Sequence, residues 1–481
     1  MSGCSGHLFD YRRGRRYIPS DKSSTKNAGH TMKVSLRFIL TVFTIFFTTG
    51  TARPQDEAAM AESVKTEFLH AWNGYKQYAW GHDALRPLTK GYRDWYSTPL
   101  QMTPVDAFDT MELMGLKKEA DEAKKLIFEK LSFDRDMEVQ TFEITIRLLG
   151  GLLSAYELDG DRRFLSLAED LGKRLLPEYN SPTGMPYRFV HLQTGKTRDS
   201  LNNPAEIGTA LIEFGTLSKL TGNDIYYQKA KNALVQLFKR RSPIGLVGTT
   251  INVETGQWVD KTSHISGMID SYYEYLLKSW FLFGDKECKA MWDSSIAAIN
   301  LYLADTTHAG LWYGQADMES GKRTGTAFGS LDAFFPAVLV LGGDLGRAAR
   351  LEESAFKMWT LNGIEAEEIN YATMTVNDAH YVLRPEVIES AYYLHHATKD
   401  PRYLDMGKAF YRGLVDYCRT DVGYAALKDV RTKEKANGMD SFFLAETLKY
   451  LYLLFAPEST LPFDDVVFNT EAHPLKRHVK N

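Results

Sequence analysis

Residues 140–176 read QTFEITIRLLGGLLSAYELDGDRRFLSLAEDLGKRLL, and this stretch decides the fold. Apolar residues recur at helical spacing in its first half, an Asp-Gly-Asp sequence interrupts them, and a second apolar helical pattern follows from Arg162. The stretch therefore predicts two helices, at 138–158 and 162–176, joined by a short turn. Neither helix can bury its apolar face alone, so such pairs must stack on one another.

The same pattern continues through the chain from about residue 57. Further helices are expected at 58–80, 204–220, 225–239, 266–282, 286–303, 331–341, 345–360, 385–397, 401–417 and 440–455. The segments DGDRRFLSLA, TGNDIYYQKA and TKDPRYLDMG resemble one another at three of the turns between helices. Weak internal repetition at helix-pair length is typical of stacked helical hairpins.

Short β-hairpins are expected between some of the helices. The segments 184–196, 245–259, 309–317 and 422–432 combine β-formers with central turn residues. Because no linker interrupts the helix pairs, we expect one all-α domain over residues 57–478, closed into an α/α barrel with small β-hairpins at one end. An open solenoid fits the periodicity as well.

The composition is that of an ordinary soluble globular protein. Of 481 residues, 44% are hydrophobic and 25% charged, and the net charge of −4 argues against a nucleic-acid partner. Aromatic residues make up 12%, and their rings pack well on pyranose rings, although a large core also uses them. We expect a monomer.

The N-terminal residues predict export. Residues 1–31 are interpreted as a disordered extension or a mis-assigned start, and residues 32–52 as a secretory signal peptide with Lys33 and Arg37 before an apolar run. An uncleaved signal anchor is the alternative; after cleavage no stable membrane insertion is expected. The chain has no Asn-x-Ser/Thr sequon, which favours a bacterial periplasmic or extracellular protein over one of the endoplasmic reticulum or secretory-pathway lumen.

Cys288 and Cys418 are the cysteines that would remain after cleavage of the signal peptide. One disulfide between them is possible, whereas a disulfide framework is not.

Acidic residues stand near the starts of five otherwise apolar helices. Glu143 lies four residues before Arg147, Glu206 seven before Glu213, and Glu386 three before Glu389; Asp270 and Glu446 complete the set. Each has a local explanation, such as an ion pair for Glu143, an N-cap for Asp270 and a helix-dipole contact for Glu386. If the helix starts meet at one end of a barrel, the acids line a cleft suited to a hard cation or to a glycosidase.

A series of motifs extends this interpretation. WGHDALRP, VDAFDTMELMGL, FEITIRLLGGLLSAY, PAEIGTALIEF, DSYYEYLLK, LRPEVIESAYYL, SFFLAETLKYLYLLF and FNTEAHPL occur in this order. Together they resemble glycoside hydrolase family 47, the class I α-1,2-mannosidases, over residues 72–475. The resemblance implies an (α/α)7 barrel and an exo-acting, inverting, calcium-dependent α-1,2-mannosidase that trims high-mannose N-glycans or oligosaccharides. Another α/α-barrel glycosidase would fit the helices but not the FNTEAHPL end.

The resemblance also implies roles for single residues. Glu143 matches the acid that protonates the glycosidic oxygen, Glu386 the base that activates water, and Asp270 a third essential carboxylate. Thr470 matches the direct protein ligand of a bound Ca²⁺. Contacts to the sugar and to the waters of the ion are implied for Arg147, Glu206, Glu213, Arg384, Glu389, Phe442, Glu446 and Glu471, with Phe442 as the platform beneath the mannose ring.

Two positions depart from the pattern of the family. Gly329, Ser330 and Leu331 stand where processing mannosidases commonly carry Asp-His-Leu, and Met268 stands where some endoplasmic-reticulum members carry Arg. Ser330 resembles the branch that acts in the disposal of misfolded glycoproteins. An active enzyme is favoured because the three carboxylates and Thr470 are all present; the alternative is a weakly active, mannosidase-like factor for glycan recognition and quality control.

Overall fold

The computed structural model describes residues 54–477; the predicted N-terminal extension and signal peptide lie outside them. The helices are α1 (Pro54–Tyr78), α2 (Met102–Asp106), α3 (Phe108–Leu113), α4 (Lys117–Lys130), α5 (Thr141–Glu143), α6 (Gly150–Asp159), α7 (Arg162–Leu175), α8 (Pro204–Gly208), α9 (Leu211–Thr221), α10 (Ile225–Phe238), α11 (Asp270–Phe283), α12 (Lys286–Tyr302), α13 (Phe335–Leu341), α14 (Leu345–Asn362), α15 (Glu386–Thr398), α16 (Arg402–Gly413) and α17 (Leu448–Phe455). Three π-helical segments, Ile144–Leu149, Leu414–Cys418 and Phe443–Thr447, join these helices within the described residues.

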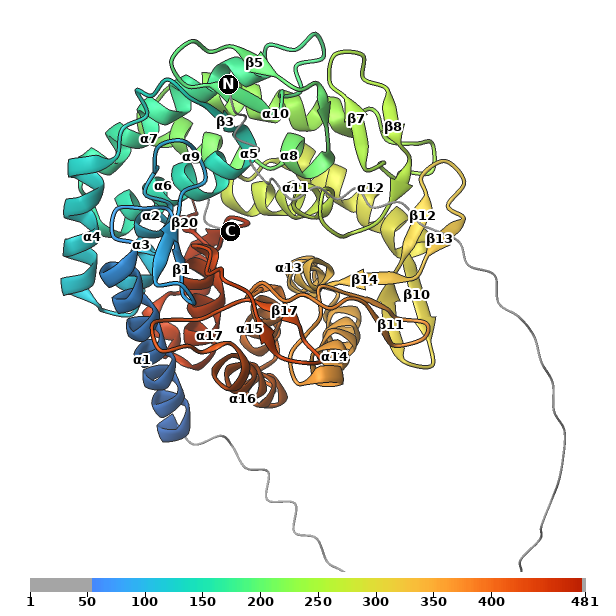
Figure 1. Ribbon diagram of the computed structural model, residues 1–481. Coiled ribbons are helices and arrows are strands. Elements are labelled where there is room, and N and C mark those ends of the chain that lie inside the picture. Colours follow the sequence, from blue (N-terminus) through green and yellow to red (C-terminus); the bar gives the residue numbers. More distant parts are fainter. Residues whose placement is uncertain (1–53, 478–481) are drawn as a thin grey trace, which may run out of the picture. The chain divides into compact units, whose positions relative to one another are not determined.

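The described helices form two concentric layers (Figure 1). The inner helices are α3, α6, α9, α11, α13, α15 and α17; packed outside them are α4, α7, α10, α12, α14, α16 and α1. Burial explains the order, because α11 buries every residue from Ser271 to Ser279, whereas α7 buries only one face, Phe164, Leu165, Ala168, Leu171, Gly172 and Leu175. A helix that is apolar on all sides must lie inside, and an amphipathic one covers it. The sequence prediction of a closed ring of helix pairs is confirmed.

The strands are short and pair antiparallel. They are β1 (Ala84–Arg86), β2 (Gly91–Arg93), β3 (Glu138–Gln140), β4 (Phe189–His191), β5 (Thr197–Arg198), β6 (Leu201–Asn202), β7 (Thr250–Asn252), β8 (Trp258–Asp260), β9 (Thr262–Ser263), β10 (Ala304–Thr307), β11 (Gly310–Tyr313), β12 (Gln315–Asp317), β13 (Arg323–Gly325), β14 (Ala327–Gly329), β15 (Glu368–Asn370), β16 (Thr375–Asp378), β17 (Leu427–Asp429), β18 (Glu434–Lys435), β19 (Val466–Phe468) and β20 (Pro474–Lys476). Most precede the start of an inner helix, so these hairpins and the inner-helix starts share one end of the ring.

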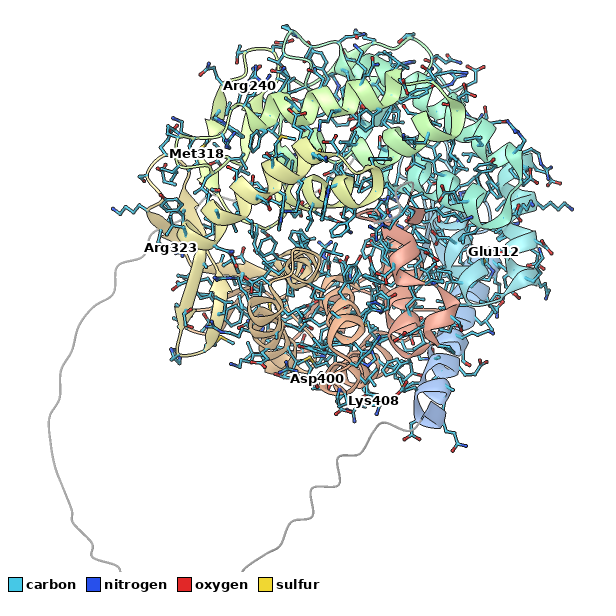
Figure 2. All side chains as sticks on the ribbon, turned by 180° about the vertical axis from the view of Figure 1, so that it is seen from behind. Glu112, Arg240, Met318, Arg323, Asp400 and Lys408 are labelled. Carbon is cyan, nitrogen blue, oxygen red and sulfur yellow. The ribbon has the colours of Figure 1, made fainter. Side chains whose placement is uncertain are left out.

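The hairpin β19–β20 has a different position. It follows the last inner helix, α17, and lies within the ring, where β19 packs on α11 and β20 on α6 (Figure 1). Side chains fill the space between the helices (Figure 2).

Several predicted boundaries were wrong for identifiable reasons. Residues 138–140 form strand β3, paired with β4, rather than the start of a helix. The helix expected at 204–220 divides into α8 and α9, because Ala210 adopts φ −151°. Short α2 and α3 and the charged α4 were not predicted at all, since none of them repeats a long apolar pattern.

Cys288 and Cys418 are both buried, free thiols, so the possible disulfide between them is not formed. Within residues 54–477, no helix combines the length and the apolar character needed to cross a membrane.

Glu178, in the turn that ends α7, gives a test of core electrostatics. It is 2% exposed, its Oε2 lacks a hydrogen bond, and burial raises its pKa from 4.5 to about 8. Because the folded state keeps this proton while the unfolded state releases it, the free energy of unfolding falls as the pH rises from about 4.5 to 8. Glu178→Gln is expected to match the parent protein near pH 5 and to exceed its stability at pH 8 by on the order of 3 kcal/mol.

Urea unfolding of parent and Glu178→Gln at both pH values measures this difference. Glu129→Gln, which changes an exposed acid on α4, is the control and is expected to show no pH-dependent difference. If Glu178→Gln changed the free energy of unfolding by the same amount at both pH values, the buried carboxyl of Glu178 would not be the cause of the pH dependence.

Candidate active site

The predicted acids lie at the end of the ring where the inner helices begin. Glu143 closes the short α5, Asp270 and Glu386 are the first residues of α11 and α15, and Glu446 lies in the π-helical segment before α17. Each follows one of the hairpins that gather at this end. Three of the predicted acids lie close together, because Arg147 interacts with Glu143 and Glu446, and Glu446 in turn with Glu386.

Arg147 links acids from three parts of the chain. Its Nε donates to Glu143 Oε2 at 2.9 Å, its Nη1 donates to Glu471, and Asp106 Oδ2 lies 3.7 Å away. Burial lowers the pKa of Arg147, but the surrounding carboxylates outweigh that effect and raise it, so the guanidinium stays charged. The predicted ion pair between residues four apart on one helix is therefore present, as part of a larger network.

Two aromatic rings flank this guanidinium. Its carbon lies 5.3 Å from the ring centre of Trp95 and 5.7 Å from that of Phe442, which is 9% exposed. Cation–π contacts of this kind hold a planar cation in a fixed orientation. Phe442 thus lies beside the arginine that binds Glu143 and Glu471.

Glu446 and Glu471 form a buried carboxyl pair. Burial raises the pKa of both carboxyls, and the hydrogen bond between them raises that of Glu446 further. The pKa of Glu471 rises to about 7, although the positive charge of Arg147 lowers it. Two adjacent carboxyls cannot both ionise cheaply without a further positive charge.

Glu386 is half-buried and its Oε2 is buried without a hydrogen-bond partner among the described residues. Burial raises its pKa to about 8, Arg384 lowers it, and Glu367 and Glu389 raise it. A carboxyl with a pKa near neutrality can exchange a proton at working pH, which is the property that a general base needs.

Arg384 pairs with an acid from another part of the chain. Its Nε donates to Glu367 Oε1 at 2.8 Å, and Glu367 Oε2 also accepts the hydroxyl of Ser330 at 3.0 Å. Sequence reasoning missed Glu367, although it lies in the acid-rich run Glu365–Glu368 just before β15. Ser330, one of the two departures from the family pattern, thus supports the Arg384–Glu367 pair.

Asp270 is half-buried at the first turn of α11. Its Oδ1 accepts the backbone N–H of Ser271 at 2.7 Å, and burial raises its pKa to about 7. The expectation that Asp270 is an N-cap was wrong by one residue, because Ile269 holds that position and Asp270 is already helical.

Glu389, on α15, faces a lysine from the inner helix α11. Lys278 Nζ lies 4.0 Å from Glu389 Oε1 and pairs more closely with Glu274, and Tyr450 donates to Glu389 Oε1 at 3.2 Å. Burial raises the pKa of Glu389 to about 7, against the effect of Lys278.

Glu206 and Glu213 do not share a helix face, because the chain breaks between α8 and α9. Glu206 makes two 2.9 Å bonds with Arg188 and also accepts the side-chain amide of Asn203. Glu213 is fully buried, accepts from Tyr275 at 2.6 Å and from Asn469 at 2.8 Å, and leaves Oε2 without a partner. Burial raises the pKa of Glu213 to about 7.

Thr470 lies at the turn of the β19–β20 hairpin inside the ring. Its backbone N–H donates to Tyr275 Oη at 3.2 Å, and the Tyr275 hydroxyl donates in turn to Glu213. Asn469 fixes the turn through Ile146 O at 2.9 Å, and Glu471 follows directly to meet Arg147. The C-terminal segment therefore brings Thr470 and Glu471 among the other candidate site residues.

The family model of glycosyl hydrolase family 47 matches residues 67–477. The chain belongs to glycosyl hydrolase family 47. The alpha-mannosidase I MNS5 of Arabidopsis thaliana is 37% identical over 446 residues, which cover 87% of this chain and 77% of that protein. The ER degradation-enhancing alpha-mannosidase-like protein 2 of Mus musculus is 38% identical over 462 residues, covering 89% and 79%.

A solved structure agrees with this membership. The alpha-1,2-mannosidase from Trichoderma reesei matches with a TM-score of 0.81 and 28% identity, covering 88% of this chain and 99% of that one. The (α/α)7 barrel expected of family 47 is thereby confirmed, and it agrees with the seven inner and seven outer helices of the described residues. These three relatives come from a plant, a mammal and a fungus, so they do not support the preference for a bacterial exported protein.

The residues of this family 47 member fit a hydrated divalent cation. The described residues contain no group of three or more His, Cys, Asp or Glu side chains arranged to hold a metal directly. However, burial raises the pKa of Glu213, Glu389 and Glu471 to about 7. In the described part of the chain, Glu213 Oε2 and Glu386 Oε2 have no hydrogen-bond partner. Such a surplus of buried carboxyls suits an ion that they contact through water, with Thr470 oxygens as the direct protein ligands.

Proposed function

We propose that this protein is an exo-acting, inverting, calcium-dependent α-1,2-mannosidase that removes terminal mannose from high-mannose N-glycans or oligosaccharides. The observation that carries the proposal is the grouping of Glu143, Asp270 and Glu386 at inner-helix starts around the Thr470 turn, within a family 47 chain. The relatives named as 1,2-alpha-mannosidases support the same activity.

Glu143 is the proposed general acid. Its side chain is 23% exposed, so it can meet the glycosidic oxygen, directly or through one water, while Arg147 holds the carboxyl in place. After proton transfer, Arg147 stabilises the resulting carboxylate, which favours the transfer.

Glu386 is the proposed general base. It removes a proton from the water that attacks the anomeric carbon on the face opposite the leaving group, so the configuration inverts. Its raised pKa makes it a stronger base than an exposed glutamate. Asp270, whose pKa is also raised by burial, is the third carboxylate, and we propose that it orients the reacting water or sugar.

The remaining site residues are proposed to bind the sugar. Phe442, whose ring centre lies 5.7 Å from the Arg147 guanidinium carbon, is assigned to pack on the C–H face of mannose. The charged groups assigned to the sugar hydroxyls are Glu206, Arg384, Glu389, Glu446 and Glu471.

Thr470 would hold Ca²⁺ through its hydroxyl and carbonyl oxygens, and Glu213, Glu389, Glu446 and Glu471 would hold the waters of the ion. When bound, the ion supplies positive charge that orients the sugar and lets these buried carboxyls ionise.

One experiment tests the proposed function. The protein is incubated with α-1,2-mannobiose and with a high-mannose N-glycan, with and without a chelator, and the released anomer is followed by proton NMR. Initial β-mannose and loss of turnover after calcium removal are expected. Initial α-mannose, or undiminished turnover without calcium, would rule out the mechanism.

The second candidate function is a weakly active factor for glycan recognition and quality control. Met268, at the departure from the family pattern, is 42% exposed, adopts φ 76°, and stands two residues before the start of α11. A side chain there cannot form the charged contacts of an arginine. Glycan binding without turnover in the NMR experiment would favour this function, for which the ER degradation-enhancing alpha-mannosidase-like relative is a precedent.

The pH dependence of kcat/KM gives a further prediction. Activity is expected to rise with pH as Glu386 loses its proton, from a pKa of about 8 without a cation. Calcium is expected to shift this rise of kcat/KM to lower pH by about one unit or more, because a nearby cation favours the ionised carboxylate of Glu386. Measurements of kcat/KM across pH at two calcium concentrations test this prediction. A rise at the same pH in both would contradict it.

We further propose that the protein works in the endoplasmic reticulum or another secretory-pathway lumen, which is the alternative location that the sequence left open. The predicted signal peptide and the relatives from eukaryotes support this location. Fractionation of cells that express the full-length chain, with protease protection of the lumenal contents, tests it.

A further inference from the structure

The turn Asn469–His473 is seated against two adjacent glycines. A Cβ on Gly150 would lie 2.5 Å from Asn469 Nδ2 and 3.2 Å from His473 Cδ2, and a Cβ on Gly151 would lie 3.2 Å from His473 Cε1 and 2.9 Å from Val105 Cγ1. These distances are too short or very tight for a side chain, so Gly150 and Gly151 leave the space that the turn occupies. We call Gly150 and Gly151 the glycine slot.

His473 bridges two buried aspartates behind this slot. Its Nδ1 lies 2.7 Å from Asp109 Oδ2 and its Nε2 lies 3.2 Å from Asp106 Oδ1, and all three side chains are at most 1% exposed. Carboxylate oxygens only accept hydrogen bonds, so both ring nitrogens donate and the imidazole is a cation. A buried ion pair with satisfied hydrogen bonds is rigid and costly to break.

Lys449, on α17, contacts Asp109 and reaches the same turn. Its Nζ lies 2.6 Å from Asp109 Oδ1 and donates to Ala472 O at 2.7 Å. The two aspartates thus face His473 and Lys449 with almost no exposed surface, and Arg147 lies 3.7 Å from Asp106. The backbone between Asn469 and His473 is therefore tied to α17 at Ala472, where φ is 57°.

Asn469 ties down the other end of the turn. Its Oδ1 accepts the backbone N–H groups of Glu471 and His473 at 2.9 and 2.8 Å, and its Nδ2 donates to Ile146 O and to Glu213. Thr470 stands between these two anchors, and Tyr275 contacts its N–H. Its position is consequently set by residues that do not touch the proposed ion.

We propose that His473 is a positioning residue: seated in the glycine slot and bridged to Asp106 and Asp109, it holds the Thr470 turn at the place where calcium binds, and so sets the calcium affinity. The proposal rests on the proposed function in one respect, the role of Thr470 as calcium ligand. Residues that orient metal ligands without contacting the metal change affinity by roughly 10–100-fold when replaced.

Calcium binding to the full-length protein, measured by isothermal titration calorimetry, tests the proposal. His473→Gln keeps one hydrogen bond to an aspartate but lacks the charge, and is expected to weaken calcium binding by about 10–100-fold. Gly151→Ala, which fills the glycine slot beside the ring, is expected to weaken it as well. Each thermal midpoint is measured in parallel, so that only folded protein is compared.

A second glycine variant separates positioning from general damage. Gly150→Ala is expected to cost calcium affinity, because its methyl would meet two side chains of the turn, Asn469 Nδ2 at 2.5 Å and His473 Cδ2 at 3.2 Å. Gly407→Ala is the matched control: its Cβ would lie 2.4 Å from Leu454 on α17, so it is expected to lower the thermal midpoint while leaving the calcium Kd unchanged.

The outcomes are distinct. A parent that binds calcium, together with a folded His473→Gln or Gly151→Ala variant that keeps the parental Kd, overturns the positioning role and leaves the proposed function intact. A folded Gly150→Ala variant with the parental Kd also overturns it. A parent that binds no calcium overturns the calcium part of the proposed function and this inference with it.

Discussion

Glu386→Gln is expected to reduce kcat by about 10²–10⁴-fold, because glutamine cannot accept a proton from the attacking water. The replacement has almost the same size and carries no charge. Since burial already raises the pKa of Glu386 to about 8, the parental side chain is itself often neutral, and the variant is expected to fold at least as well as the parent. Binding of a high-mannose glycan is expected to remain, which makes the loss specific to the chemical step.

Glu365→Gln is the matched control for this experiment. Glu365 is the same residue type, is fully buried, and interacts electrostatically with Glu386. Neither of its carboxyl oxygens has a hydrogen-bond partner within residues 54–477. It has no proposed contact with sugar or water, so its variant is expected to keep the parental kcat. Activity of Glu386→Gln above about a tenth of the parental value, in folded protein, would contradict the assignment of the base.

Local patterns of the sequence predicted local structure well. The Glu143–Arg147 pair lies four residues apart on one helix, so its contact could be read from spacing alone, and the structure has it at 2.9 Å. The apolar periodicity of 162–176 likewise predicted α7, which spans Arg162–Leu175. Strand β3 could not be predicted in this way, because its pairing with β4 depends on a partner about fifty residues away.

The partners of the site residues lie farther along the chain. Arg188 meets Glu206, Glu367 meets Arg384, and Arg147 meets Glu471 across more than three hundred residues. No spacing rule connects such positions. The short strands before α8 and α15 bring the first two pairs together, and the closure of the ring brings together the third. Family resemblance named Glu471 and Arg384, but neither resemblance nor spacing identified Glu367 as the carboxylate that holds Arg384.

The FNTEAHPL segment shows what family resemblance could predict and what only the folded structure reveals. The resemblance singled out Thr470, whereas the roles of Asn469 and His473 became visible only with Asp106, Asp109 and the glycine slot around them. Both aspartates belong to the motif VDAFDTMELMGL, and both glycines to FEITIRLLGGLLSAY, so three distant motifs meet in one buried contact.

Thr470→Ala is expected to raise the calcium concentration needed for half-maximal activity by about 10–100-fold, and to leave little activity at low calcium. Alanine removes the hydroxyl but keeps the backbone carbonyl, so one of the two proposed protein ligands survives. The carboxyls that would hold the waters of the ion, Glu213 and Glu471 among them, are untouched. We therefore expect excess calcium to restore part of the activity rather than none.

Thr470→Ser, which keeps the hydroxyl, is the control and is expected to follow the parental calcium dependence. Thermal stability provides a second measurement, because an ion that binds only the folded state stabilises it by about 2.7 kcal/mol at a hundred times its Kd. Thr470→Ala should lose most of that increment at a calcium concentration where the parent and Thr470→Ser retain it. Parental calcium dependence in a folded Thr470→Ala variant would show that the Thr470 hydroxyl is not a ligand of the ion.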